Sequence, residues 1–152
     1  MDKFVSKNEQ DTIDFAYKLA SKLNTGDIII LSGELGSGKT KFTQGILKYF
    51  NLESEISSPT FTIVNEYISP IQNIYHFDVY RLTDSDEFYE IGGEEYFEKG
   101  ICIIEWGEII EDILPPNYIK ISFSKDLKNP DYRILNITTI GYKYNELFYR
   151  KD

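Results

Sequence analysis

The sequence predicts an α/β fold built around a mixed β-sheet. Residues 28–31 form a run of isoleucine and leucine, which is typical of a buried parallel strand. A glycine-rich loop follows this run at once, and behind the loop apolar residues recur at the spacing of a helix. Helical and strand-like segments interleave early in the chain, whereas strand-like segments dominate later. This pattern favours helices packed on a sheet with both parallel and antiparallel strands.

The first predicted helix lies before this strand. Ser6 and Glu9 have the spacing of a capping box, which marks a helix start. Four apolar residues then recur at helical spacing: Ile13, Ala16, Ala20 and Leu23. Gly26 is expected to end this helix, and Asp27 leads into the strand. A second helix, behind the glycine-rich loop, is indicated by Phe42, Ile46, Leu47 and Phe50.

Two strands and a helical segment are expected in the middle of the chain. The stretches 60–67 and 73–80 are rich in β-formers, and a turn around Ser69-Pro70 joins them. Residues 84–98 are acidic and aromatic, and we expect short helices broken at Gly92-Gly93.

The remaining elements are mostly strands. The apolar stretch 100–106 is typical of another buried strand, and a helical turn at 108–113 ends before two prolines. Residues 118–124 and 132–139 alternate apolar and polar side chains around a Lys-Asn-Pro-Asp turn, which predicts an antiparallel pair.

Composition limits the classes of function. A chain of 152 residues suits one domain, and its start lacks the apolar core of a signal peptide, so we expect a cytoplasmic protein. The net charge of −9 argues against free-standing nucleic-acid binding, although a place in a larger assembly that handles RNA stays open. The single cysteine, Cys102, lies in an apolar run and is interpreted as a small buried hydrophobic residue.

The loop from Gly33 to Thr40 matches the phosphate-loop pattern, with four residues between the required glycines. Glycines let the backbone turn tightly so that its N–H groups face a phosphate, and the following helix adds the positive end of its dipole. Lys39 is expected to reach the β- and γ-phosphates, and Thr40 to bind Mg²⁺.

Carboxylates for such a site are offered by two strand ends. Asp78 ends one predicted strand and Glu105 ends another. Ligands of open α/β sheets bind outside the carboxyl ends of the strands, so Lys39, Asp78 and Glu105 are expected to converge there. The alternative for each acid is a solvent-facing residue at a strand end.

Several further residues have two readings. Thr60, after Ser58-Pro59, would meet the γ-phosphate or Mg²⁺, as switch loops do, or would simply begin a strand. Arg81 would touch phosphate or a partner, or form a surface salt bridge. Trp106 is either a core residue or a partner-facing aromatic. His76 is interpreted as a strand residue that faces a polar neighbour.

Four motifs in this order resemble one family. They are GELGSGKT, SPTFTIVNEY, HFDVYRL and IEWGE. Together they are similar to the bacterial ATPase subunit of tRNA threonylcarbamoyladenosine synthesis, the TsaE (YjeE) family. The resemblance implies a P-loop NTPase-like fold whose central, mainly parallel sheet is flanked by antiparallel strands and helices. It implies one P-loop ATPase domain over residues 1–152, although the tail after about residue 141 resembles nothing specific.

The resemblance also implies a function. Members of this family bind ATP with Mg²⁺ and hydrolyse it weakly alone. They join two sugar-kinase-like subunits, one of which transfers the threonylcarbamoyl group to an adenosine beside the anticodon. ATP binding favours assembly, and hydrolysis resets the complex between turnovers. The protein would therefore reach tRNA through its partners and would have no membrane role.

Site roles follow from the resemblance motif by motif. Lys39, Thr60, Asp78 and Glu105 would be catalytic, with Glu105 favoured for orienting the attacking water. Thr40, Asp78 and Glu105 would hold Mg²⁺. The residues that would bind the nucleotide are Gly33, Glu34, Leu35, Gly36, Ser37, Gly38, Lys39, Thr40 and Trp106.

The chain departs from the family pattern at four places. Glu34 stands where the family often has Asp, and Ser37 stands where Ala is common. Lys41 replaces a frequent Thr, and Gly107 replaces a frequent Pro. None of these changes removes a group that the chemistry requires, but Lys41 adds a positive charge at the start of the helix.

Two other classes of function remain open from the sequence. A small nucleotide or metabolite kinase would close an arginine-rich lid over the phosphates, but this chain has only Arg81, Arg133 and Arg150, which are scattered. A regulatory nucleotide-binding module without useful turnover has the same motifs. The chain lacks the Asn-Lys-x-Asp string that selects guanine in many GTPases, which supports ATP as the nucleotide.

Overall fold

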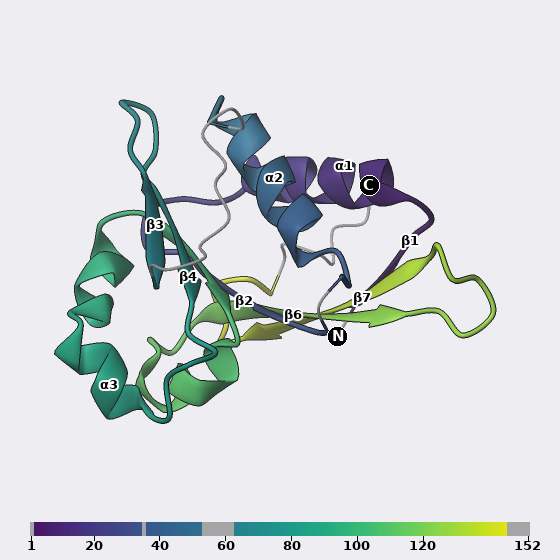
Figure 1. Cartoon of the computed structure of the whole chain (residues 1–152). Helices are drawn as coiled ribbons and strands as arrows, with labels where there is room; N and C mark the ends of the chain where they lie inside the picture. Colours follow the sequence, from purple (N-terminus) through teal and green to yellow (C-terminus); the bar gives the residue numbers. More distant parts are fainter. Residues whose placement is uncertain (1, 35, 53–62, 146–152) are drawn as a thin grey trace.

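A mixed β-sheet forms the centre of the protein in a computed structural model that describes residues 2–34, 36–52 and 63–145 (Figure 1). Its strand order is β1-β7-β6-β2-β5-β4-β3. The strands are β1 (Asp2–Ser6), β2 (Ile28–Ser32), β3 (Val64–Tyr67), β4 (Ile74–Asp78), β5 (Ile101–Glu105), β6 (Tyr118–Lys125) and β7 (Arg133–Ile140). The four central strands β6, β2, β5 and β4 are mutually parallel, and antiparallel strands flank them on both sides. The predicted fold class is therefore confirmed.

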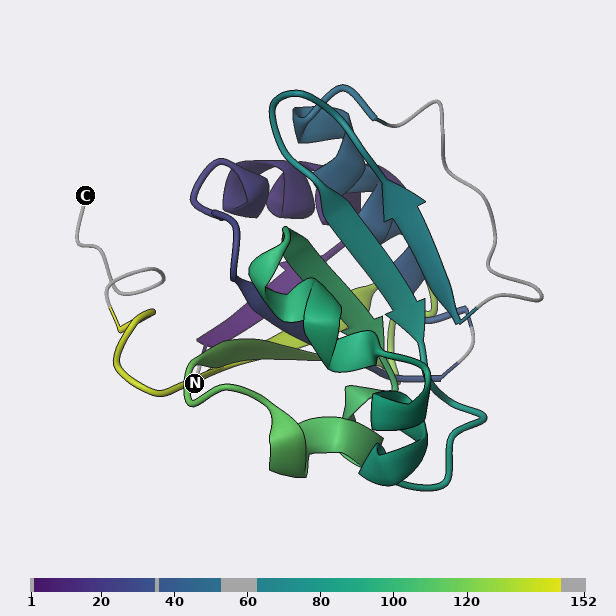
Figure 2. The same ribbon diagram turned by 90° about the vertical axis from the view of Figure 1, so that its left-hand side faces the viewer.

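Helices cover both faces of this sheet (Figures 1 and 2). α1 (Glu9–Ala20) and α2 (Lys39–Tyr49) pack together on one face. The other face carries α3 (Ser85–Glu90) and two 3₁₀ helices, η2 (Gly93–Glu98) and η3 (Gly107–Ile113). Among the described helices, none combines the length and the hydropathy needed to cross a membrane.

The apolar run of β2 serves both layers. Ile29 and Leu31 belong to the core under α1 and α2, whereas Ile28 and Ile30 belong to the core under α3 and the 3₁₀ helices. All four side chains are fully buried. Side chains alternate across a strand, so a central strand that is covered on both faces must be apolar at every position.

The start of α1 differs from the sequence prediction. Ser6 is the last residue of β1, and Asn8 is the N-cap, whose side chain accepts a hydrogen bond of 2.8 Å from the backbone N–H of Asp11. The Ser6 hydroxyl instead contacts Thr12 Oγ1 at 2.6 Å. The predicted capping box was therefore wrong, because Ser6 is held in an edge strand that pairs with β7. The helix also ends at Ala20, before the predicted glycine.

The other predicted elements are confirmed where the structure describes them. β3 and β4 form an antiparallel pair, and β6 and β7 form a second one. The helical segment between β4 and β5 breaks at Gly92, whose φ of 72° suits a glycine. The first residues of the predicted strand 60–67 lie outside the described residues. β1 was not predicted.

The chain after β7 returns to the core. Tyr144 is 4% exposed, and its hydroxyl donates a 2.6 Å hydrogen bond to the Oδ1 atom of the buried Asp27. The Lys143 ammonium lies 2.7 Å from the same oxygen. Burial, followed by the bond to Asp27, raises the pKa of Tyr144, so its hydroxyl remains a donor. Residues 143 and 144 therefore fasten the chain to the corner where α1 leads into β2.

Removal of this hydroxyl is expected to destabilise the protein. The variant Tyr144→Phe should lower the free energy of unfolding by about 1–3 kcal/mol, because a buried carboxylate loses a donor. Chemical denaturation measures the change. Tyr142→Phe is the matched control, since Tyr142 is 89% exposed and should have almost no effect. Equal stability of the two variants would show that the contact with Asp27 does not fasten the chain.

Candidate functional site

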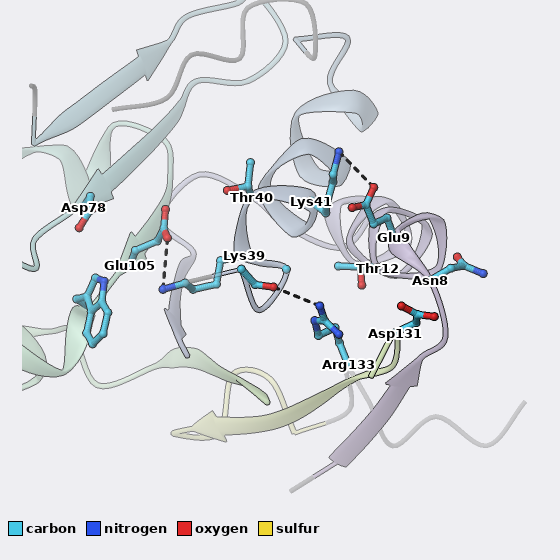
Figure 3. Close-up of a pocket in the computed structure, with 13 residues that line it drawn as sticks. Asn8, Glu9, Thr12, Lys39, Thr40, Lys41, Asp78, Glu105, Asp131 and Arg133 are labelled. Atoms are coloured by element: carbon cyan, nitrogen blue, oxygen red, sulfur yellow. Dashed lines mark hydrogen bonds and ion pairs between the residues drawn. The ribbon is translucent and has the colours of Figure 1, made fainter. Parts of the chain in front are cut away.

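A pocket of about 310 Å³ opens where the central strands end and α2 begins (Figure 3). The ends of β4 and β5 supply Asp78 and Glu105, and the start of α2 supplies Lys39 and Thr40. The start of α1 and the β6–β7 hairpin complete its wall. This place, outside the carboxyl ends of parallel strands, is where α/β sheets bind ligands.

The loop between β2 and α2 depends on its glycines. Gly36 and Gly38 have φ values of 81° and 110°, and Gly38 is the N-cap of α2. Gly33 has a φ of 139°, and a Cβ atom there would lie 2.7 Å from the carbonyl oxygen of Phe123. No side chain caps α2, so the N–H groups of its first turn are left for another acceptor. Such a helix start favours an anion.

Lys39 lies in the wall of the pocket and is only 7% exposed. Its ammonium donates a 2.8 Å hydrogen bond to the carbonyl oxygen of Gly33. It also lies 3.7 Å from Glu105 Oε1 and 4.7 Å from the centre of the Trp106 ring. A buried lysine needs such partners, and they fix its positive charge at the wall of the pocket.

Asp78 and Glu105 are neighbours across the sheet. They are paired in register between β4 and β5, and both line the pocket. Glu105 is 13% exposed in its side chain, and its Oε2 lies 2.6 Å from His76 Nε2. Burial acts to raise the pKa of Glu105, but the hydrogen bond and charge of His76, together with Lys39, outweigh it and lower the pKa. Glu105 is therefore a carboxylate at neutral pH.

The residues present fit Mg²⁺ held jointly with a phosphate ligand. Within residues 2–34, 36–52 and 63–145, no three His, Cys, Asp or Glu side chains come together as a metal cage. Thr40, Asp78 and Glu105 instead offer one hydroxyl and two carboxylates around the same pocket. Mg²⁺ in nucleotide sites is commonly bound by one or two carboxylates together with substrate phosphates and water.

Trp106 lines the pocket and is not a residue of the buried core. It is 39% exposed and has a φ of 65°, in the left-handed region that a bulky residue rarely adopts. Its backbone N–H donates to the carbonyl oxygen of Leu31 at 3.1 Å. Strained backbone of this kind is concentrated at functional sites. In this protein the residue with the unusual backbone conformation is the one whose indole ring lies beside Lys39.

The far end of the pocket consists of residues that the sequence analysis did not select. Asn8 and Thr12 come from α1, and Asp131 and Arg133 come from the β6–β7 hairpin (Figure 3). The Arg133 guanidinium donates a 3.4 Å hydrogen bond to the carbonyl oxygen of Gly36. No motif marked these residues, because more than a hundred positions separate them along the chain. They meet in the pocket only because β1 pairs with β7 in the folded sheet.

The other candidate residues lie outside the pocket lining or outside the described residues. The carbonyl oxygen of Gly33 accepts the hydrogen bond from Lys39. The side chain of Glu34 is exposed, and that of Ser37 is buried. Arg81 stacks on Tyr80, with 5.8 Å from its guanidinium carbon to the ring centre. Leu35 and Thr60 lie outside the described residues.

The structure also describes Lys41 and Cys102, of which Cys102 is buried as predicted. Lys41 lines the pocket and lies 3.6 Å from Glu9, so its extra charge is paired on the surface. Cys102 is buried, and burial raises the pKa of its thiol to about 12, which makes it unreactive.

A GxxxxGKT loop between a central strand and a helix, with carboxylates at neighbouring strand ends, defines an α/β protein of the phosphate-loop class. The model of one family, "Threonylcarbamoyl adenosine biosynthesis protein TsaE", matches residues 6–134. The chain belongs to this family, as its motifs indicated.

Individual relatives agree with this assignment. The chain is 41% identical over 135 residues to the tRNA threonylcarbamoyladenosine biosynthesis protein TsaE of Rickettsia bellii, covering 88% of this chain and 92% of the relative. The protein of the same name from Bacillus subtilis is 36% identical over 146 residues, covering 95% and 90%. The crystal structure of Bacillus subtilis YdiB superposes with a TM-score of 0.74 at 32% identity, covering 96% of this chain and 90% of that one.

Proposed function

We propose that this protein is the Mg²⁺-dependent, ATP-binding and ATP-hydrolysing subunit of the complex that forms threonylcarbamoyladenosine in tRNA beside the anticodon. The observation that carries the proposal is the meeting of Lys39, Asp78 and Glu105 in one pocket at the start of α2. Membership of the TsaE family supplies the process in which such a site would act.

One orientation of ATP in the pocket is proposed. Its β- and γ-phosphates would lie against the first turn of α2 and the Lys39 ammonium, where backbone N–H groups and a positive charge meet. The nucleoside would extend toward Asn8, Thr12 and Arg133, which line the pocket at the end away from Asp78 and Glu105. The choice of adenine rests on the family and on the missing guanine-selecting string.

The residues of this chain would share the work of hydrolysis. Thr40 and Asp78 would hold Mg²⁺, with Glu105 beside it, and the bound ion would neutralise charge on the phosphate oxygens. Lys39 would stabilise the negative charge of the transferred phosphoryl group. Glu105 would orient the attacking water, since its carboxylate can accept a hydrogen bond from it. Thr60 is proposed as a switch-like residue that senses the γ-phosphate.

Two partner subunits with sugar-kinase-like folds would complete the machinery. ATP binding would favour assembly, and hydrolysis would reset the complex. The proposed location is the cytoplasm. The test is reconstitution of tRNA modification from the partner subunits with and without this protein. Repeated modification per complex should require this protein and hydrolysable ATP. Equal turnover without it would contradict the proposal.

The isolated protein is expected to bind tRNA weakly. Its net charge is −9, and nucleic-acid affinity depends on neutralising phosphates with basic side chains. A filter-binding or polarisation titration at physiological salt should give a Kd no tighter than about 10⁻⁴ to 10⁻⁶ M, the range of non-specific binding. The assembled complex should bind more tightly. Tight binding by the protein alone would mean that it contacts tRNA directly.

A further inference from the structure

His76 is a buried polar residue that the proposed chemistry has not yet used. It is 5% exposed and lies in the middle of β4, on the same face as Asp78, two residues further on. Its register partner on the neighbouring β5 is Ile103, so Glu105 follows on the same face of that strand. His76 is not part of the pocket wall. Any effect that it has on a nucleotide must therefore pass through another residue.

That residue is Glu105. The distance from His76 Nε2 to Glu105 Oε2 is 2.6 Å. Glu105 is a carboxylate beside the Lys39 ammonium and can only accept hydrogen bonds, so Nε2 carries the proton and donates it. The second carboxylate oxygen, Oε1, is the one that faces Lys39 at 3.7 Å. The two oxygens thus have separate partners, one in the sheet and one in the pocket.

We propose that His76 is a positioning residue for ATP hydrolysis: its hydrogen bond to Oε2 fixes the Glu105 carboxylate with Oε1 toward the phosphate end of the pocket. This inference rests on the proposed function. A glutamate has three rotatable side-chain bonds, and Glu105 is the last residue of its strand. Without His76 the carboxylate would lose this 2.6 Å contact, and the side-chain torsions of Glu105 would be free to move both oxygens away from their present positions. Misplacement of a catalytic group by about 1 Å can cost on the order of 100-fold in rate.

The test compares two substitutions in the full chain with its partner subunits. His76→Leu removes the donor at similar volume, whereas His76→Gln keeps an N–H near the position of Nε2. We expect His76→Leu to lower kcat by about 10- to 100-fold while the Kd for ATP changes less than about threefold, and His76→Gln to restore most of kcat. If His76→Leu does not fold, His76→Asn takes its place, because its shorter amide does not reach Glu105.

A double-mutant cycle separates positioning from a general structural role. In the Glu105→Gln background, His76→Leu should lower kcat no further, since the group that it positions is already gone. Unchanged kcat in His76→Leu, or a full additional loss in the double variant, would overturn the inference. If the wild type itself neither binds nor hydrolyses ATP, the proposed function fails. If the wild type hydrolyses ATP, Glu105→Gln does not and His76→Leu does, only the role of His76 fails.

Discussion

The variant Lys39→Ala is expected to lose ATP affinity by roughly 100-fold or more, because truncating one partner of a buried charge pair costs about 2–5 kcal/mol. Lys39 is 7% exposed and is held in the pocket wall by Gly33, Glu105 and Trp106. Its removal would also leave the Glu105 carboxylate facing the phosphates without a cation, so the two losses act in the same direction.

Tryptophan fluorescence offers a direct measurement. Trp106 is the only tryptophan of the chain, and its ring lies 4.7 Å from the Lys39 ammonium, so its emission should change when ATP binds. For variants that alter the tryptophan fluorescence itself, calorimetry gives the Kd for ATP. The matched control is Lys48→Ala, which removes an exposed lysine in the last turn of the same helix, outside the pocket lining. The control should change affinity much less, and unchanged affinity in Lys39→Ala would mean that the loop does not bind phosphate.

The second large effect is expected for Glu105→Gln. Replacement of a group that orients or deprotonates the attacking water lowers rates by about 100- to 10,000-fold. ATP binding should persist, because Lys39 and the first turn of α2 remain. The amide has nearly the same shape and can still accept a hydrogen bond from His76, so the fold should not change. Steady-state hydrolysis together with a binding titration measures both quantities.

Glu108→Gln is the control for this experiment. Glu108 is exposed in η3, three residues further on, and is absent from the pocket wall. It should hydrolyse ATP like the wild type. If Glu105→Gln kept full turnover, Glu105 would have no chemical role. If instead ATP affinity fell only in the presence of Mg²⁺, Glu105 would act chiefly as a ligand of the metal.

The local parts of the fold could be predicted from the sequence. β2, the glycine-rich loop and α2 follow one another directly along the chain, and the central strands β2 and β5 are apolar runs. The same pattern placed Lys39 at the start of a helix and Asp78 and Glu105 at strand ends, and the structure brings all three to one pocket. Periodicity and turn residues are sufficient where each contact is made within a short segment.

Contacts between distant segments could not be predicted. β1 exists because it pairs with β7, which lies about 130 residues later, and its own five residues carry too little pattern. Arg133 reaches the pocket because β7 places the hairpin beside the phosphate loop. The short contact between His76 and Glu105 depends on the parallel register of β4 and β5, although the sequence did suggest a polar neighbour for His76.

Backbone conformation was the other missing information. Trp106 has a φ of 65°, in the left-handed region. Glycine is the residue that usually indicates this conformation in a sequence, and position 106 is not a glycine. The spacing of Ser6 and Glu9 predicted that Ser6 caps a helix. Ser6 instead pairs with β7 as the last residue of the edge strand β1, and Asn8 is the N-cap. In both cases tertiary contacts decided the local structure.

ATP hydrolysis by the purified protein, alone and with its two proposed partner subunits, distinguishes an ATPase from a kinase. We expect slow, Mg²⁺-dependent hydrolysis by the protein alone and a clear increase when both partners are present. A small metabolite phosphorylated in place of water, with no effect of the partners, would contradict it and would assign the pocket to a kinase.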